Sequence, residues 1–194
     1  MALRPEKTAL ILIDVQSAFV ERERAGERRN NPGALDNMVR LLEAFRARGL
    51  AVFHVRHAST EAHSLLRPER PGFQPIEAVR ERAGEPVFVK NVNSAFIGTG
   101  LEEGLRRDDA RTLVLAGITT NHCVETTARM AGNLGFDTRL VEDACYTFDR
   151  IGHGGQRETA EAIHAMTLSN LDGEFATIET TNSVLAALNA SAAA

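Results

Sequence analysis

The sequence predicts an α/β fold of three layers, in which helices cover both faces of a mainly parallel, six-stranded sheet. Short, almost continuously apolar runs recur along the chain, and helical patterns separate them. Such alternation is typical of parallel sheets that are buried on both faces. The length of 194 residues suits a single domain, 1–194, and hardly allows two.

Six segments have the composition of buried strands, and they lie at 9–15, 51–55, 87–90, 112–116, 138–141 and, shorter, 175–178. The clearest helix begins after the Asn-Asn-Pro signal at 30–32, places its apolar residues on one stripe and ends at Gly49. Further helices are predicted over about 123–134 and about 156–170.

Two other segments are predicted to be loops. The segment 21–29 carries charges at nearly every position, which indicates a solvated loop. The segment 58–75 contains three of the six prolines and is predicted to cross over the sheet. Loops of that length often form the walls of binding pockets.

Composition excludes several classes of function. The net charge of −4 gives no reason to expect nucleic acid or a membrane as partner, and no apolar run approaches the eighteen residues of a spanning helix. Two cysteines do not make a disulfide framework, and the polar first residues do not resemble a secretory signal. We therefore expect a cytoplasmic protein that acts on a small molecule.

Cys123 is the first candidate for chemistry, because it follows an apolar strand and opens a predicted helix. Helix N-termini favour a thiolate over a thiol and can hold an oxyanion, although free cysteines are also common core residues. Asp14 and Lys90 likewise end apolar runs. Charged groups are seldom buried without partners, so these three residues predict a shared polar site.

Their positions suit a site at one edge of the sheet. In open parallel sheets, ligands bind beyond the carboxyl ends of the strands, where the strand order reverses. With the order 3-2-1-4-5-6, Asp14 and Cys123 become neighbours across this reversal. Lys90 would begin roughly 10 Å from Asp14, at ~4.8 Å per strand, a gap that the long lysine stem can largely close.

The chain resembles the isochorismatase-like cysteine hydrolases, a superfamily that includes nicotinamidases, N-carbamoylsarcosine amidases, ureidoacrylate and biuret amidohydrolases, streptothricin hydrolases and isochorismatases. The resemblance rests on four motifs in the expected order, LIDVQSAF at 12–19, VKNVNSAF at 89–96, GITTNHCV at 117–124 and VEDAC at 141–145. Segments 164–171 and 173–176 are similar to the nicotinamidase-related and streptothricin-hydrolase-like branch.

This resemblance implies a Rossmann-like fold, an Asp14–Lys90–Cys123 catalytic triad and a cis peptide bond between Ile118 and Thr119. The N–H groups of Thr119 and Cys123 would form the oxyanion hole. The implied activity is that of an amidohydrolase, which cleaves a carbon–nitrogen bond of a small amide, lactam or carbamoyl compound through a thioester on Cys123. The resemblance also implies a homodimer or homotetramer.

Two alternatives remain open at this point. One is an isochorismatase-type hydrolase of a vinyl ether, which would not depend on a cysteine nucleophile. The other is a non-catalytic protein with a thiol-based redox or binding role, in which Asp14 and Lys90 would have no evident purpose.

Six further residues are candidates for substrate binding, and they are Gln16, Phe19, His57, Asn93, Phe96 and Tyr146. Phe19 and Phe96 suit a hydrophobic core equally well, and the polar side chains of Gln16 and Asn93 could instead satisfy loop backbone. The single tyrosine carries a hydroxyl that suits the mouth of a pocket. Cys145 is predicted to be a structural residue in a loop after the fifth strand.

A metal site is disfavoured. Nicotinamidases of the superfamily bind a divalent ion through an Asp-x-His pair and a more distant histidine, but the stretch 53–59 has no such pair although His54, His57 and His63 lie nearby. Arg56 would also repel a cation. We therefore expect neither metal nor cofactor, and we predict that His54 is a hydrogen-bonded structural residue. The Gly-rich segment 150–155 fits no phosphate-binding fingerprint and is predicted to be a turn.

Overall fold

The computed structural model describes residues 3–190 and contains one six-stranded parallel sheet. Its strand order, β3-β2-β1-β4-β5-β8, is the order predicted from the sequence, with β8 as the sixth strand of the sheet. The strands are β1 (Thr8–Ile13), β2 (Ala51–His57), β3 (Val87–Lys90), β4 (Thr112–Ile118), β5 (Asp137–Tyr146) and β8 (Thr177–Glu179). The predicted three-layer α/β fold is therefore confirmed.

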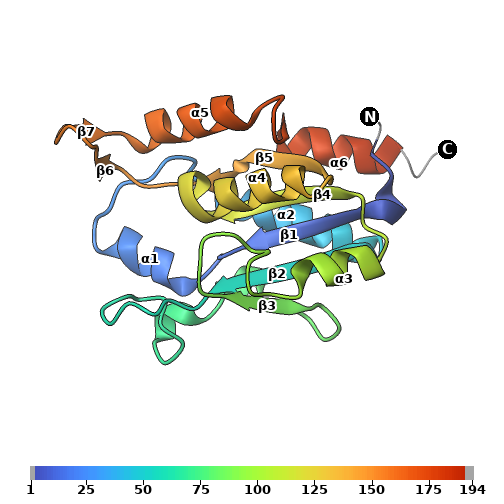
Figure 1. The fold of residues 1–194 in the computed structure, drawn as a ribbon, viewed down its shortest axis with the longest axis horizontal. Helices are drawn as coiled ribbons and strands as arrows, with labels where there is room; N and C mark the ends of the chain where they lie inside the picture. Colours follow the sequence, from blue (N-terminus) through green and yellow to red (C-terminus); the bar gives the residue numbers. More distant parts are fainter. Residues whose placement is uncertain (1–2, 191–194) are drawn as a thin grey trace.

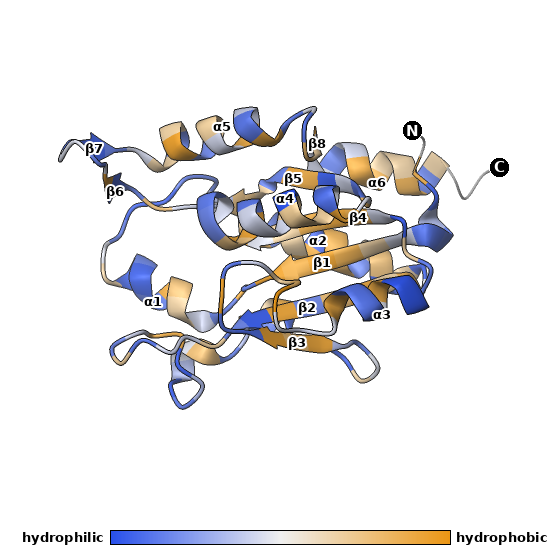
Figure 2. Ribbon diagram, viewed as in Figure 1, coloured by the Kyte–Doolittle hydropathy of each residue, from blue (hydrophilic) through white to orange (hydrophobic). Residues whose placement is uncertain are grey.

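Helices cover both faces of this sheet (Figure 1). On one face, α2 (Ala34–Ala47) and α6 (Thr181–Ala190) bury their apolar residues against β1, β4 and β5. On the other face lie α3 (Leu101–Arg107), α4 (Glu125–Asn133) and α5 (Ala160–Leu171). Hydrophobic residues concentrate in the strands and on the inner sides of the helices (Figure 2). None of the helices in the described part of the chain is long and apolar enough to cross a membrane.

The remaining elements are short, and most of them lie near the carboxyl ends of the strands. Helix α1 (Ser17–Arg24) follows β1, and the short strands β6 (Arg150–Ile151) and β7 (Arg157–Glu158) form an antiparallel hairpin that extends past the end of the sheet (Figure 1). Single turns of 3₁₀ helix occur at Pro5–Lys7, Pro71–Phe73 and Glu77–Val79. A π-helical turn, Thr120–Val124, joins β4 to α4.

Three local predictions were wrong. The charged segment 21–29 begins as helix, because α1 is anchored by the buried Phe19, whose ring stacks on Phe148 with centroids 6.3 Å apart. The helix expected from 156 begins only at Ala160, since 157–158 pair with β6. Cys145 lies within β5 rather than in a loop, because this strand continues to Tyr146 past a register shift.

Gly117 allows β4 to pass close to β1 just below the candidate site. Its φ is +148°, and a Cβ atom there would lie 2.1 Å from the carbonyl oxygen of Ile13. That oxygen belongs to the residue directly before Asp14, so the space between the two backbones admits only a hydrogen atom. The separation of the two site-bearing strands thus depends on this glycine.

Replacement of Gly117 by alanine is expected to lower the free energy of unfolding by about 3 kcal/mol, because one of the two paired backbones must move away. Chemical denaturation followed by circular dichroism measures this change. Gly33→Ala is the matched control, since a Cβ atom at Gly33 meets nothing within 4 Å and the expected loss is below about 1 kcal/mol. Equal stability of the two variants would contradict the account of Gly117.

Candidate active site

Asp14, Lys90 and Cys123 lie together at the carboxyl ends of three strands. Asp14 directly follows β1, Lys90 is the last residue of β3, and Cys123 lies in the π-helical turn after β4. The backbone of Asp14 is left-handed, with φ of +53°, a conformation that aspartate adopts more readily than most residues. Its N–H donates to the Val55 carbonyl at 2.9 Å, which fixes it to the end of β2.

The ammonium group of Lys90 is the centre of this cluster. It donates to Asp14 Oδ2 at 2.7 Å and to Cys123 Sγ at 3.2 Å. The side chains of Lys90 and Asp14 are 0% and 1% exposed, so their ion pair is withdrawn from water. In the sheet, Lys90 of β3 is paired with His57 of β2. Its long side chain reaches past β2 to Asp14 at the end of β1.

His57 is the third neighbour of Lys90. Its Nδ1 atom lies 3.1 Å from the lysine Nζ, so this nitrogen accepts a hydrogen bond from the ammonium, and the ring is neutral with its hydrogen on Nε2. Burial, together with the positive charge of Lys90, lowers the pKa of His57, which agrees with a neutral ring. The three ammonium protons therefore have three acceptors.

The proton of Cys123 is held tightly in the absence of substrate. Burial, reinforced by the negative charge of Asp14, raises the pKa of the Cys123 thiol to about 12 despite the opposing effect of Lys90. Burial also raises the pKa of Asp14 against the influence of Lys90. A helix N-terminus is expected to lower the pKa of Cys123, but the pKa is raised. Burial and the neighbouring carboxylate outweigh the helix dipole.

Asp14 has an oxygen available for that proton. Its Oδ1 atom is buried and has no hydrogen-bond partner within residues 3–190, whereas Oδ2 accepts from Lys90. A carboxylate oxygen of Asp14, Sγ of Cys123 and a ring nitrogen of His57 all lie within 4.8 Å of one another. Because Oδ1 accepts no hydrogen bond and the carboxylate lies close to the sulfur, Asp14 can act as a proton acceptor for the thiol.

These same three groups do not form a good metal site. Their spacing would allow a shared cation, but the ammonium of Lys90 contacts Asp14, Cys123 and His57. A divalent ion among them would be repelled by that charge and would compete for the same lone pairs. The donor set therefore does not fit a resident metal ion.

The N–H groups of Thr119 and Cys123, which are expected to form the oxyanion hole, belong to the segment after β4. The peptide bond between Ile118 and Thr119 is cis. The Thr119 carbonyl accepts from the N–H groups of His122 and Val124, at 3.2 Å and 3.3 Å, and so fixes the turn that carries Cys123. His164 of α5, which sequence reasoning did not single out, contacts the Thr120 hydroxyl of this turn at 2.9 Å.

The predicted substrate-binding residues occupy different environments. Gln16 is fully buried, and its amide binds the backbone of His57 and of Phe73. It thereby joins β1 to β2 and to the 58–75 loop. Asn93 is exposed in the loop after β3. Neither side chain makes a hydrogen bond to Asp14, Lys90 or Cys123 in the described structure.

The aromatic candidates are largely enclosed by other side chains. Phe19 is 7% exposed in the core on the α2 side of the sheet, and Phe96, 8% exposed, stacks on Phe136. Tyr146 is 2% exposed, and its hydroxyl donates to Glu23 at 3.3 Å beneath the guanidinium of Arg29. The tyrosine therefore lies beneath α1 rather than at an open pocket mouth.

His54 has the structural role expected for it. Its Nε2 atom lies 2.9 Å from Glu85, which also accepts two hydrogen bonds from Arg46. Burial would raise the pKa of Glu85, but hydrogen bonds from Arg46, from the backbone of Arg82 and from His54 lower it to about 2. This group ties β2 to α2 and belongs to the framework of the fold.

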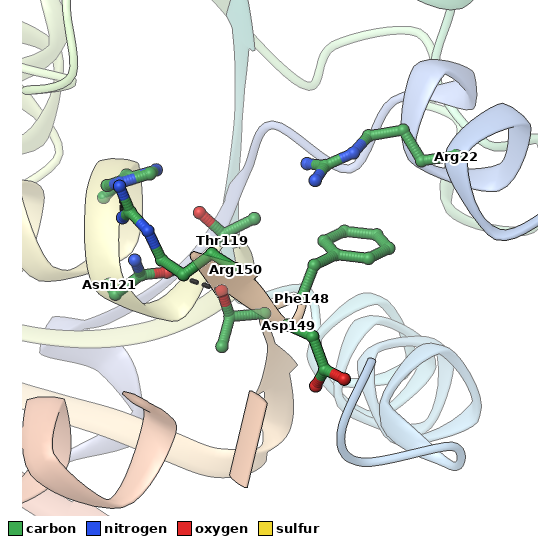
Figure 3. A pocket seen from close by; sticks show the side chains of 8 residues that line it. Arg22, Thr119, Asn121, Phe148, Asp149 and Arg150 are labelled. Carbon is green, nitrogen blue, oxygen red and sulfur yellow. Dashed lines mark hydrogen bonds between the residues drawn. The ribbon is translucent and has the colours of Figure 1, made fainter. Parts of the chain in front are cut away.

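A cavity of about 250 Å³ lies next to the Cys123 turn (Figure 3). Thr119 and the turn residues Asn121 and His122 line one part of it, and α1 contributes Arg22. The remaining lining comes from the segment 147–150. No local sequence pattern predicts this cavity, because its walls come from segments that are distant along the chain.

The comparisons with known proteins agree with this fold. Residues 8–183 match the family described as Isochorismatase domain. The chain belongs to the isochorismatase family.

Its relatives within the isochorismatase family include the family protein YrdC of Bacillus subtilis (strain 168), which is 44% identical over 93% of this chain and 95% of the relative. A crystal structure of an isochorismatase-family protein from Chromobacterium violaceum is similar, with a TM-score of 0.92 and 45% identity over 98% of this chain and 97% of the other. Nicotinamidase 3 of Arabidopsis thaliana is 29% identical, covering 87% of this chain and 82% of its own length.

Proposed function

We propose that this isochorismatase-family hydrolase is a cysteine amidohydrolase that cleaves a carbon–nitrogen bond of a small molecule through a thioester on Cys123. The observation that carries the proposal is the contact of one buried ammonium, Lys90, with both Asp14 and Cys123 at 2.7 and 3.2 Å. A thiol beside both a carboxylate base and a cationic group is an arrangement that can activate the sulfur as a nucleophile. A relative that is itself named a nicotinamidase supports amide chemistry.

The reaction follows from these contacts. Asp14 accepts the Cys123 proton, and Lys90 stabilises the thiolate as the sulfur attacks the amide carbonyl. The N–H groups of Thr119 and Cys123 are proposed to hold the resulting oxyanion. Asp14 then gives its proton to the leaving nitrogen, and the carbon–nitrogen bond breaks. A water that loses its proton to Asp14 hydrolyses the thioester, which releases the acid and restores the thiol.

The high pKa of the Cys123 thiol is compatible with this mechanism. A thiol with a pKa of about 12 is protected from indiscriminate reaction at neutral pH. Transfer of its proton to the adjacent Asp14 generates the thiolate only within the cluster, where Lys90 compensates the charge. The proton affinities therefore belong to the group as a whole rather than to one residue.

A panel of small amides, lactams and carbamoyl compounds tests the proposal through release of ammonia or amine, measured by mass spectrometry. We expect at least one compound to be hydrolysed. Failure on the whole panel, together with oxidation-dependent assembly or partner binding, would favour the redox alternative instead. Hydrolysis of a vinyl ether that persists in Cys123→Ala would favour the isochorismatase-type reaction.

His57 is proposed to act as a positioning residue for Lys90. Replacement by leucine removes the acceptor at 3.1 Å, so the ammonium can turn away from Asp14 and Cys123. We expect kcat to fall about tenfold with a smaller change in KM, in line with the loss of one hydrogen bond to a charged group. His57→Gln, which restores an acceptor, is expected to recover part of kcat and of the wild-type pH profile.

Steady-state kinetics across pH measures both parameters. A rise in KM with kcat unchanged, in both variants, would contradict the positioning role and would indicate that His57 contacts the substrate instead.

A further inference from the structure

We propose that the cavity beside the Cys123 turn is a subsite for a carboxylate group of the substrate, with Arg150 as its principal ligand. This inference rests on the proposed function, because it assigns a substrate class to that amidohydrolase. The cavity shares Thr119 with the candidate oxyanion hole, so one molecule can extend from Cys123 into it. Its volume of about 250 Å³ corresponds to roughly eight waters at ~30 Å³ each, enough for a carboxylate on a short chain.

Arg150 is an arginine without an internal counter-ion. Its guanidinium lies 3.2 Å from Nε2 of His122, and no carboxylate in the described structure lies within ion-pair distance of it. Because a guanidinium can only donate, Nε2 of His122 accepts this hydrogen bond and the imidazole is neutral. The ring therefore does not compensate the positive charge of Arg150. Burial, together with the charge of Arg150, lowers the pKa of His122. Most other arginines around this edge, by contrast, are paired with carboxylates.

Arg22 approaches the same cavity from α1. It lies over the ring of Phe148, 3.9 Å from the centroid, and pairs with Glu27 through Nε and Nη2. Its Nη1 atom makes no hydrogen bond within residues 3–190. Arg22 and Arg150 lie on opposite sides of Thr119 in Figure 3, so an anion beside Thr119 would have a guanidinium on each side.

The one acidic residue of the lining does not cancel these charges. Asp149 receives hydrogen bonds from Arg28 at 3.0 Å, from Arg157 at 2.7 Å and from the Ala160 N–H at 2.7 Å. Its carboxylate points away from Arg22 and Arg150 in Figure 3. The amide oxygen of Asn121 accepts from the Thr147 hydroxyl at 2.5 Å, which leaves its NH₂ group as a further donor for an anion.

The test compares the binding of matched probes to the Cys123→Ala protein by calorimetry. The probes are the half-amides succinamate, glutaramate and adipamate, and the controls are the corresponding neutral diamides. At least one half-amide is expected to bind about tenfold more tightly than its diamide, because a charged hydrogen bond contributes a factor of this order. The series of chain lengths finds the spacing between the reacting amide and the subsite.

Arg150→Gln in the same background is expected to weaken half-amide binding about tenfold to a hundredfold and to leave diamide binding unchanged. Arg150→Lys should retain part of the preference. The matched control is Arg24→Gln, which removes the same charge from an exposed position of α1 outside the cavity lining and should change neither affinity. Equal binding of half-amides and diamides, an equal loss for both in Arg150→Gln, or no binding of any probe at millimolar concentration would overturn the subsite.

Turnover by the wild-type protein separates this inference from the proposed function. If the protein binds half-amides preferentially but hydrolyses neither them nor any other amide, the proposed amidohydrolase activity is contradicted and the carboxylate subsite is supported. If the protein hydrolyses diamides and shows no preference for half-amides, the amidohydrolase activity is supported and the carboxylate subsite is contradicted.

Discussion

Replacement of Cys123 by alanine is expected to reduce amide hydrolysis by about 10⁴-fold or more, because no other group in the cluster can form the acyl intermediate. Cys123→Ser is expected to be almost as inactive, since an alcohol beside Asp14 is a much weaker nucleophile than a thiolate. Rates of ammonia or amine release on the best substrate from the amide panel measure both variants.

Cys145→Ala is the matched control for this experiment. Cys145 is the other cysteine of the chain, is fully buried in β5 and makes no contact with Lys90 or Asp14 in the described structure. Its replacement should leave the rate near that of the wild type. Amide hydrolysis that survives in Cys123→Ala at more than a few per cent of the wild-type rate would contradict a cysteine mechanism.

Replacement of Lys90 by methionine is expected to lower kcat/KM at neutral pH by about 10³-fold. Burial raises the pKa of Asp14, and the ammonium of Lys90 opposes that rise. Without this charge the pKa of Asp14 rises further, so at a given pH a smaller fraction of Asp14 is ionised and able to accept the proton from Cys123. The thiolate also loses the cation that stabilises it.

The pH profile gives this prediction a definite sign. Asp14 must be unprotonated to act as a base, so wild-type activity is lost as the pH falls through its raised pKa. In Lys90→Met the loss must begin at a higher pH, and raising the pH should recover part of the rate. Lys7→Met, which breaks an exposed ion pair with Asp109, is the matched control and should leave the profile unchanged. An acid limb that stays in place or moves to lower pH in Lys90→Met would contradict the role of Lys90.

The sheet was predictable from the sequence because its strands are buried on both faces and are therefore almost continuously apolar. The same pattern located Asp14 and Lys90, since a charged residue that ends such a run must lie at the edge of the sheet. The order of the strands then brought Asp14 and Cys123 to adjacent strands, and the structure places Lys90 in contact with both.

Other features depend on contacts that no local pattern encodes. Helix α1 is stabilised by the packing of Phe19 against Phe148, which is far away along the chain. The charged composition of 21–29 therefore predicted a loop where the helix continues. The pKa of Cys123 depends on the extent of burial, which sequence position alone does not give. Arg22 and Arg150 line one cavity only because α1 and the β6–β7 hairpin converge on the Cys123 turn.

Intact-protein mass spectrometry of a rapidly quenched reaction tests the thioester mechanism most directly. With a hydrolysed amide in excess, we predict a transient adduct whose mass equals that of the acyl part of the substrate, located on Cys123 by peptide mapping and absent from Cys123→Ala. Multiple turnovers by the wild-type protein with no acyl adduct on Cys123 at any quench time, and undiminished turnover by Cys123→Ala, would contradict the account.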